Sequence, residues 1–530
     1  MYLKIYIRPK RKNVYIITIP FYKMKKWVKL SLLCAIILVN ILLAYQPHFN
    51  YSYPLLTDEY NHIAFAKYIV NEHKLPFTNP YLAYPEKLTN LESGFHFFLA
   101  LLFSIIPGEP ILYYKYFIII FMIFNSLLLF YLVMLWFKSY YTALLSVLFY
   151  GAIKSTGDLL VHNYFLPLTM GITLLLLSFI FFYKWENTAG WKNRYLVCLV
   201  VISLITIITY PPTLTFFAGI LFLYILFMSH NIHEKFNLKK RHFLIYFAVI
   251  SAIIIIISLI LMTYLNLTKF VIFPDTWTPV QSKYSPIFFF GVISSAFAFF
   301  GLISIIKEKK IILCWFIFSL IQIYLYYIFK FNILVPFARL FAFYLIGLSI
   351  LAGIGVVYIY KIINNYPNKS KKIRDIGYIK IITIIIILIL ILVNYYFIIK
   401  NPLNPKYIIT DETYDIIKFL NNNYKEDVII LSTGLITHAI YPATGQHVLG
   451  MINANLGGGF QKEVNQFLNA VCKEKNNMLK NGYFPALEAN NLSDTKTLIL
   501  SKSEFNCSFL NSVYNKTYYV YEIDKEKLGN

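Results

Sequence analysis

Long apolar stretches separated by short polar segments dominate residues 27–399 of this 530-residue chain. A stretch of roughly 17–25 apolar residues can cross a bilayer as a helix. The pattern predicts eleven such helices, near residues 27–45, 111–137, 140–156, 164–183, 195–210, 213–229, 243–265, 286–305, 311–328, 336–360 and 379–399. Because eleven is an odd number, the two ends of the chain are expected on opposite sides of the membrane.

One apolar stretch is too short to be counted among these spans. Residues 93–106 provide only about 14 positions before Pro107-Gly108-Glu109-Pro110 ends the run, which is short for a membrane span. Counting it as a span would move every later loop to the other side. We therefore expect an interfacial or re-entrant helix inside a long first outer loop, residues 46–110.

Basic residues set the orientation of the chain. Residues 1–26 carry eight lysines and arginines and no acid, and further basic clusters lie near residues 184–194, 235–241, 307–310 and 361–380. With eleven helices, all of these segments fall on one side, and the positive-inside rule assigns that side to the cytoplasm. The sequence thus predicts a cytoplasmic N-terminus (1–26), a polytopic α-helical transmembrane domain (27–399) and an extracytoplasmic C-terminal region (400–530).

The pattern changes after Lys400, where apolar runs shrink to five or six residues. These short runs predict a small α/β domain, with helices at 411–423 and 460–478 and strands at 427–432, 497–501 and 518–523. Gly457-Gly458-Gly459 marks a turn. Cys472 and Cys507 lie in this domain; whether they pair stays open, because sequence alone gives no geometry.

Composition agrees with a membrane protein. Hydrophobic residues make up 58% of the chain, charged residues only 14%, and the mean hydropathy is +0.61, which excludes a soluble globular protein. Residues 400–530 carry 13 basic and 13 acidic side chains, so the formal net charge of +23 belongs to the membrane half. Charge between apolar segments indicates topology and contact with membrane lipids, and no nucleic-acid partner is expected.

Asp58 and Glu59 are the first acids of the chain and lie in the first outer loop. Thr57 before them is a typical helix N-cap, and acids in a first helical turn complement the helix dipole. A structural role for the two acids therefore competes with a chemical one.

The stretch TDEYNHIAFAKYIVNEHKLPFTNPY, residues 57–81, together with Tyr84-Pro85, resembles the first outer loop of GT-C integral-membrane glycosyltransferases. These enzymes take sugars from polyprenyl-phosphate carriers. The resemblance implies an inverting transferase of the cell envelope that uses a polyprenyl-phosphate sugar donor and a lipid, glycan or protein acceptor at the outer face. Asp58 would act as base or metal ligand, with Glu59 in support.

Two branches of that class are disfavoured by missing motifs. The WWDYG sequence of oligosaccharyltransferases is absent, and so is the histidine-proline-proline signature of protein O-mannosyltransferases. The acceptor therefore stays unassigned.

Three further residues are expected in the same pocket. His62 lies four residues after Asp58 and shares its helical face, where it would position the carboxylate or bind a metal; the alternative is a surface histidine. Glu92 and His96 repeat the four-residue spacing at the start of the short apolar segment.

The second outer loop supplies a candidate metal site. Asp158 is the only acid between Glu109 and Glu186, and its location matches the second acidic motif of oligosaccharyltransferases, although the DxD spacing is absent. With Asp58 and His162 it is a candidate site for Mg²⁺ or Mn²⁺, ions that prefer oxygen ligands. The alternative is an ion pair between Lys154 and Asp158.

A cation is expected for the carrier phosphate. Arg339 stands within apolar sequence at the outer start of a span, where an arginine is costly unless paired or facing a polar cavity. Lys154 is a weaker candidate, and the alternative for Arg339 is snorkelling to the interface. In the same helix, Ser349, Gly353 and Gly355 predict close helix packing rather than ligand contact.

Two other functions compete with glycosyl transfer. In a transporter or flippase of a lipid-linked or charged solute, Asp58, Asp158 and Arg339 would handle a proton or the solute. In an inactive relative they would serve only an envelope scaffold.

Overall fold

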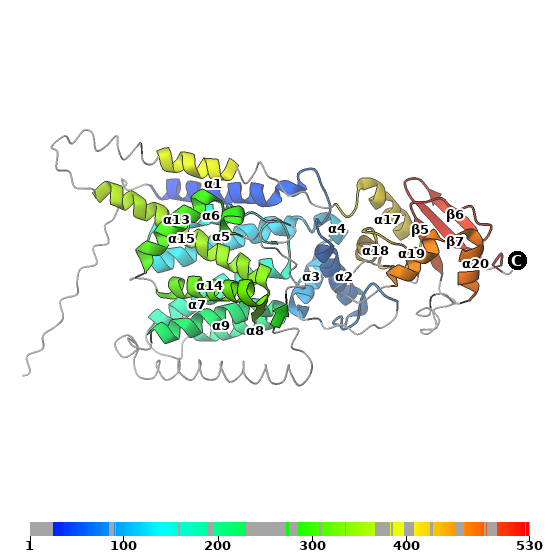
Figure 1. Ribbon diagram of the computed structural model, residues 1–530, viewed down its shortest axis with the longest axis horizontal. Helices are drawn as coiled ribbons and strands as arrows, with labels where there is room; N and C mark the ends of the chain where they lie inside the picture. The colour runs from blue at the N-terminus through cyan, green and yellow to red at the C-terminus, as the bar shows by residue number, and fades with distance from the viewer. Residues whose placement is uncertain are drawn as a thin grey trace, which may run out of the picture.

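The computed structural model describes residues 25–83, 90, 92–156, 159–188, 194–228, 272–274, 285–306, 310–333, 335–365, 382, 385–396, 407–424, 428–450, 460–481, 484, 496–524 and 526–528. The molecule is elongated, with a helical bundle at one end and a small sheet domain at the other (Figure 1). The segment predicted as the first outer loop lies between the two, and its described residues contact both.

The bundle is built from apolar helices that run roughly along the long axis (Figure 1). Five of the described helices are long and apolar enough to cross a membrane: α1 (Lys26–Tyr45) with η1 (Gln46–His48), α5 (Tyr116–Phe137), α7 (Pro167–Asn187), α14 (Lys310–Phe329) and α15 (Phe337–Asn365). Shorter apolar helices accompany them: α6 (Tyr140–Gly151), α8 (Arg194–Thr209), α9 (Pro211–Met228), α12 (Pro286–Phe290), α13 (Val292–Ile305) and Ile385–Tyr396. The chain is therefore a membrane protein, but the predicted count of eleven spans is not confirmed, and the span expected at 243–265 lies outside the described residues.

α15 is the central helix of the bundle. Residues 340–357 of this helix are all buried, whereas half of the residues of α1 are exposed. A Cβ added at Gly355 would lie 1.8 Å from the carbonyl oxygen of Phe297 in α13, and one at Gly301 would lie 1.9 Å from that of Leu351. No side chain fits between these backbones, so the close packing predicted for this helix is confirmed.

Short helices form the layer between bundle and sheet. α2 (Thr57–Glu72) packs on α3 (Ser93–Ile105), and α4 (Pro110–Tyr113) follows. At about 1.5 Å per residue, α3 is roughly 20 Å long, less than the hydrocarbon thickness of about 30 Å. It lies beside α2 at the end of the bundle (Figure 1). Its N-terminus abuts α8, where a Cβ at Gly94 would meet the Ile208 carbonyl oxygen at 2.9 Å.

The C-terminal domain contains a five-stranded mixed sheet in the order β4-β3-β5-β7-β6. β3 (Ile429–Leu431) pairs in parallel with β4 (His447–Leu449) and β5 (Thr497–Ser501), while β7 (Tyr519–Ile523) runs antiparallel to β5 and β6 (Leu510–Asn515). Away from this sheet, β1 (Ile272–Pro274) pairs with β2 (Phe331–Ile333).

Helices complete the C-terminal domain. They are α17 (Asp411–Asn423), α18 (Thr437–Thr444), α19 (Gln461–Asn469) and α20 (Cys472–Lys480). The helix expected at 460–478 is therefore wrong as one unit, because the chain becomes extended at Ala470 and Val471. A disulfide joins Cys472 to Cys507 and so ties α20 to the segment before β6.

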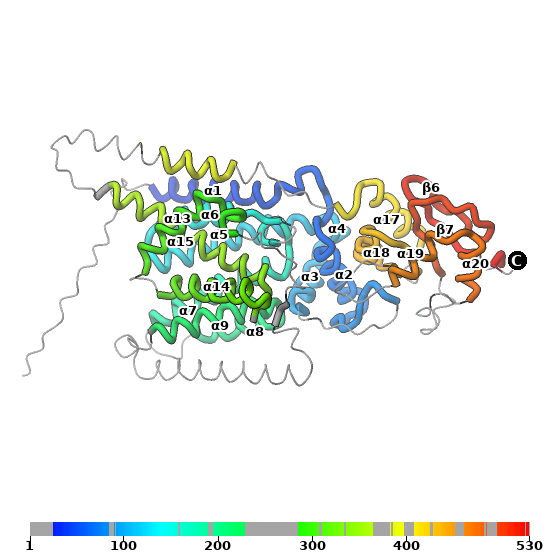
Figure 2. The backbone as a smooth tube through the Cα atoms, in the orientation of Figure 1, coloured from blue at the N-terminus to red at the C-terminus, as the bar shows by residue number. Residues whose placement is uncertain are grey.

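The first outer loop is fastened to the C-terminal domain by polar contacts. The backbone carbonyl of Tyr81 accepts from the backbone N–H of Val448 in β4 at 2.8 Å. The Tyr81 hydroxyl donates to Oδ1 of Asn61 in α2, so Tyr81 connects β4 to α2. Lys67 Nζ donates to the carbonyl of Ala443 in α18 at 2.9 Å. Figure 2 shows the backbone of α18 next to α2. These contacts fix α2, which carries the candidate site, from its outer side.

Candidate functional site

Glu59 is held by backbone amides at the start of α2. Its Oε2 accepts from the N–H groups of Leu55 (2.7 Å) and Leu56 (3.3 Å), and its Oε1 accepts from the N–H of Phe165 (3.0 Å). The side chain is fully buried. Burial raises its pKa to about 7, although the three amide hydrogen bonds favour the ionised form. Glu59 thus joins the first turn of α2 to the segment at 159–166, and it fixes the place of its neighbour Asp58.

Asp58 is half-buried in the same turn. Burial raises the pKa of its carboxyl group, and the charge of Arg339 opposes that rise. A half-buried carboxyl group whose pKa is raised by burial binds a proton more readily than a free aspartate, which makes Asp58 a candidate general base.

Arg339 lies in the first turn of α15 and is half-buried. Its side chain is hydrogen-bonded to that of Tyr210, between α8 and α9. Its charge also acts on His62 and Glu92, so the guanidinium is near three ionisable groups of the outer loop. The arginine expected at the carrier phosphate is thus within electrostatic reach of the candidate base Asp58.

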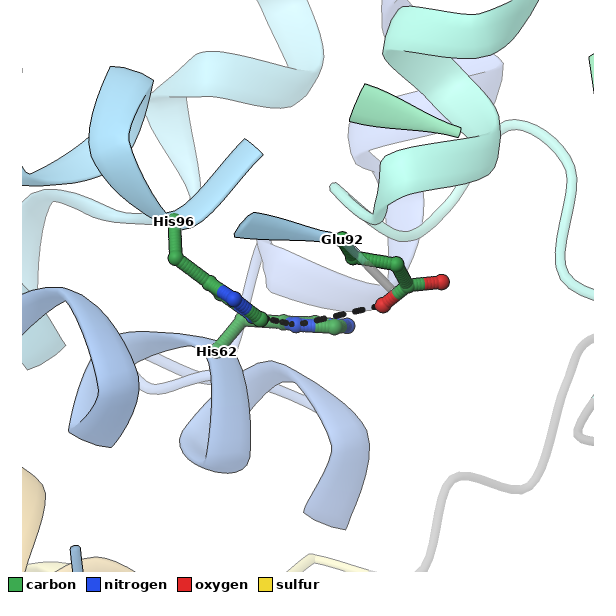
Figure 3. A group of neighbouring side chains, drawn as sticks. All are labelled: His62, Glu92 and His96. Atoms are coloured by element: carbon green, nitrogen blue, oxygen red, sulfur yellow. Dashed lines mark hydrogen bonds and ion pairs between the residues drawn. The ribbon is translucent and has the colours of Figure 1, made fainter. Parts of the chain in front are cut away.

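His62, Glu92 and His96 form a cluster between α2 and the start of α3. Figure 3 shows the three side chains turned toward one another. His62 Nδ1 lies 2.8 Å from His96 Nε2 and 4.0 Å from Glu92 Oε2. Burial, with the Arg339 charge, lowers the pKa of His62 to about 3, and burial raises the pKa of Glu92 to about 7. Burial therefore favours the neutral form of both side chains.

Of the site residues predicted in the second outer loop, the structure describes Lys154 and His162, and both make contacts of their own. Asp158 lies outside the described residues. His162 is buried, with its Nε2 2.8 Å from the carbonyl oxygen of Tyr150. Lys154 places its ammonium 4.9 Å from the ring centre of Phe288 in α12, a cation–π contact.

Two residues near the site carried no signal in the sequence. Asn90 hydrogen-bonds His96, and Tyr210 hydrogen-bonds Arg339. One is an asparagine in a chain rich in asparagine, and the other a tyrosine beside apolar helices. Only the folded arrangement distinguishes them from other residues of their type.

Solved structures with the same fold include those of an archaeal oligosaccharyltransferase and of ArnT. The Archaeoglobus fulgidus oligosaccharyltransferase AglB, solved in the apo form and with an inhibitory peptide and a dolichol-phosphate, gives a TM-score of 0.55 at 12% identity, over 91% of this chain and 70% of AglB. ArnT of Cupriavidus metallidurans, bound to undecaprenyl phosphate, gives a TM-score of 0.51 at 10% identity, over 94% of this chain and 98% of ArnT. No protein-family model and no curated protein sequence matches the chain. The expected resemblance to GT-C glycosyltransferases is confirmed for the fold.

Proposed function

We propose that this protein is an inverting glycosyltransferase that moves a sugar from a polyprenyl-phosphate donor to a lipid, glycan or protein acceptor at the outer face of the membrane. The observation that carries this proposal is that Asp58, in the layer of short helices at the end of the bundle (Figure 1), lies close enough to Arg339 for the positive charge of the arginine to oppose the rise in its pKa that burial causes. Solved structures of this fold hold a dolichol-phosphate or undecaprenyl phosphate, which supports a lipid-phosphate donor.

The proposed roles follow from the charges. Asp58 takes the proton of the acceptor hydroxyl or amide while the acceptor atom attacks the anomeric carbon. The bond between that carbon and the carrier phosphate breaks, and its electron pair leaves with the phosphate. Arg339 stabilises this developing negative charge with a planar guanidinium that matches phosphate geometry. Glu59 acts through Asp58, as a positioning residue.

The metal proposed from the sequence fits these residues only in part. Asp58 supplies an oxygen ligand of the kind that Mg²⁺ and Mn²⁺ prefer. His162 would offer such an ion only its Nδ1, because Nε2 is hydrogen-bonded to the Tyr150 carbonyl oxygen, and an imidazole nitrogen is a poorer ligand for Mg²⁺ or Mn²⁺ than an oxygen. No step of the proposed transfer depends on this ion.

The orientation and the role of the outer domain belong to the same proposal. The basic segment 1–26 would lie in the cytoplasm and residues 400–530 outside. The C-terminal domain would cover the site and select the acceptor, since α18 packs directly on α2.

Binding of the carrier phosphate tests the proposal. Full-length protein in detergent is titrated with undecaprenyl phosphate, as wild type, Arg339→Gln and Arg194→Gln; Arg194 is exposed at the start of α8 and serves as the control. Loss of a charge-assisted hydrogen bond, about 1.5–3 kcal/mol, predicts roughly 10- to 100-fold weaker binding for Arg339→Gln only. Equal affinity of all three proteins would contradict the role of Arg339.

A transfer assay separates this function from transport. Proteoliposomes receive a panel of polyprenyl-phosphate monosaccharides and acceptor extracts. Labelled sugar on an acceptor supports the transferase. Movement of the labelled carrier across the bilayer without any transfer would favour the flippase instead.

A further inference from the structure

His62, Glu92 and His96 place three metal-binding side chains around one point between α2 and α3. One donor atom of each lies within 4.8 Å of the other two (Figure 3). We propose that these residues form a site for a divalent transition-metal ion, with Zn²⁺ the best match. The inference does not depend on glycosyl transfer, because it concerns only what these three side chains bind.

The donor set selects the class of metal. Two imidazole nitrogens and one carboxylate oxygen are typical of zinc sites that keep a fourth position open for water or a substrate oxygen. Mg²⁺ and Ca²⁺ prefer oxygen ligands alone. The cluster therefore differs in chemistry from a carboxylate site built on Asp58.

The distances permit a tetrahedral site after small side-chain movements. With metal–ligand bonds of about 2.0–2.1 Å, neighbouring ligand atoms in a tetrahedron lie about 3.3 Å apart. His62 Nδ1 and His96 Nε2 are now 2.8 Å apart, and His62 Nδ1 and Glu92 Oε2 are 4.0 Å apart. The first distance must open by roughly half an ångström, and the second must shrink by a little more. The donor atoms of His96 and Glu92, which lie within 4.8 Å of each other, must also approach to about 3.3 Å, and rotation of the partly exposed Glu92 side chain can supply this movement.

Asn90 fixes His96 in the tautomer that a metal needs. The Asn90 Nδ2 donates to the Pro76 carbonyl, while its Oδ1 accepts from the backbone N–H of Glu92 at 3.1 Å. The same Oδ1 lies 3.1 Å from His96 Nδ1. An amide oxygen only accepts, so His96 must carry its proton on Nδ1 and leave the Nε2 lone pair facing the cluster. Metal-binding histidines commonly use their second ring nitrogen in this way.

Burial closes the site on one side and leaves it open on the other. His96 is 2% exposed, and the side chains of His62 and Glu92 are 12% and 32% exposed. An ion would enter past Glu92 and be held against the two histidines. The charges of Arg339 and Asp58 reach Glu92. Metal binding requires Glu92 as a carboxylate, so the ion would stabilise the ionised form of this side chain.

Metal binding is measured on the full-length protein with a tag that contains no histidine. The protein is stripped with a chelator, and Zn²⁺ content is determined by elemental mass spectrometry after re-addition and desalting. Co²⁺ serves as a spectroscopic probe, because tetrahedral and octahedral cobalt differ strongly in their visible absorption. The expected result is one tightly bound ion per chain and a tetrahedral spectrum with nitrogen ligands.

Variants assign the ion to the cluster. His62→Gln and His96→Gln are expected to weaken Co²⁺ binding more than about 100-fold, and Asn90→Ala about 10- to 100-fold, the usual cost of losing an outer-shell partner. His73→Asn is the control, because His73 is exposed at the end of α2 with a φ of 55°, a conformation that asparagine tolerates.

Any of three results would overturn the inference: the wild-type protein holds no stoichiometric metal, the cobalt spectrum is octahedral, or the variants bind metal like the wild type. Glu92→Gln changes a more exposed position and should also lose the ion. It therefore tests the site even if a histidine variant fails to fold. Because no sugar donor is present, failure here leaves the proposed transferase untouched, and success does not establish it.

Discussion

Replacing Glu59 by glutamine should remove a specific part of the pH dependence of stability. Glu59 is fully buried, and its pKa is raised from 4.5 to about 7, chiefly by burial. When the pH rises above 4.5, the unfolded chain releases this proton while the folded protein keeps it. The contribution of Glu59 to the free energy of unfolding is therefore fully present below pH 4.5 and is lost as the pH rises toward 7.

The size of the effect follows from the shift. A difference of about 2.5 pKa units at 1.36 kcal/mol each corresponds to about 3 kcal/mol, an order-of-magnitude figure. Glutamine does not titrate, so Glu59→Gln should lose this dependence. The variant should also be less stable at pH 5, because its NH₂ group replaces an acceptor facing a backbone N–H.

The assay is thermal unfolding in one detergent at pH 5 and pH 8. Wild type and Glu72→Gln, an exposed acid at the far end of α2, should lose a similar amount of stability between the two values. Glu59→Gln should lose about 3 kcal/mol less. If all three proteins show the same difference, the buried carboxylate does not have the described proton affinity, and the reasoning from its burial is refuted.

Two further predictions concern packing and the outer domain. Gly355→Leu should force α15 away from α13, because even a Cβ would lie 1.8 Å from the Phe297 carbonyl oxygen, and a destabilisation of about 3 kcal/mol or more is expected; a monodisperse, normally stable variant in size-exclusion chromatography and thermal unfolding would contradict it. Replacing Cys472 and Cys507 by serine opens a link across 35 residues and should destabilise the C-terminal domain by about 3–4 kcal/mol in the chain-entropy account. Faster proteolysis of that domain, with the bundle intact, would confirm the destabilisation. Unchanged proteolysis would contradict it.

Local signals explain which elements could be predicted. α17 begins at Asp411 as expected, because Thr410 accepts from the backbone N–H of Thr413 and acids occupy the first turn. The strand Thr497–Ser501 was also found from its apolar run. The break at Ala470 escaped prediction because no glycine or proline marks it.

The candidate site could be predicted residue by residue but not as an arrangement. Asp58 and Arg339 can be recognised in the sequence because charged residues are scarce among its apolar stretches. The pairing of His62 with His96 spans 34 residues, and that of Arg339 with the outer loop spans many helices. Such contacts depend on tertiary packing, which a periodic pattern does not encode. Asp58 and Asp158 stay a predicted pair, since Asp158 lies outside the described residues.

Transfer by an Asp58→Asn variant tests the central claim most directly. Wild type, Asp58→Asn and Glu72→Gln are compared in one assay that measures undecaprenyl-phosphate binding and transfer from the polyprenyl-phosphate sugar accepted by the wild type. A lost general base predicts transfer at least about 100-fold slower in Asp58→Asn, with carrier binding kept. Unchanged transfer by Asp58→Asn would contradict the proposal that Asp58 is the catalytic base.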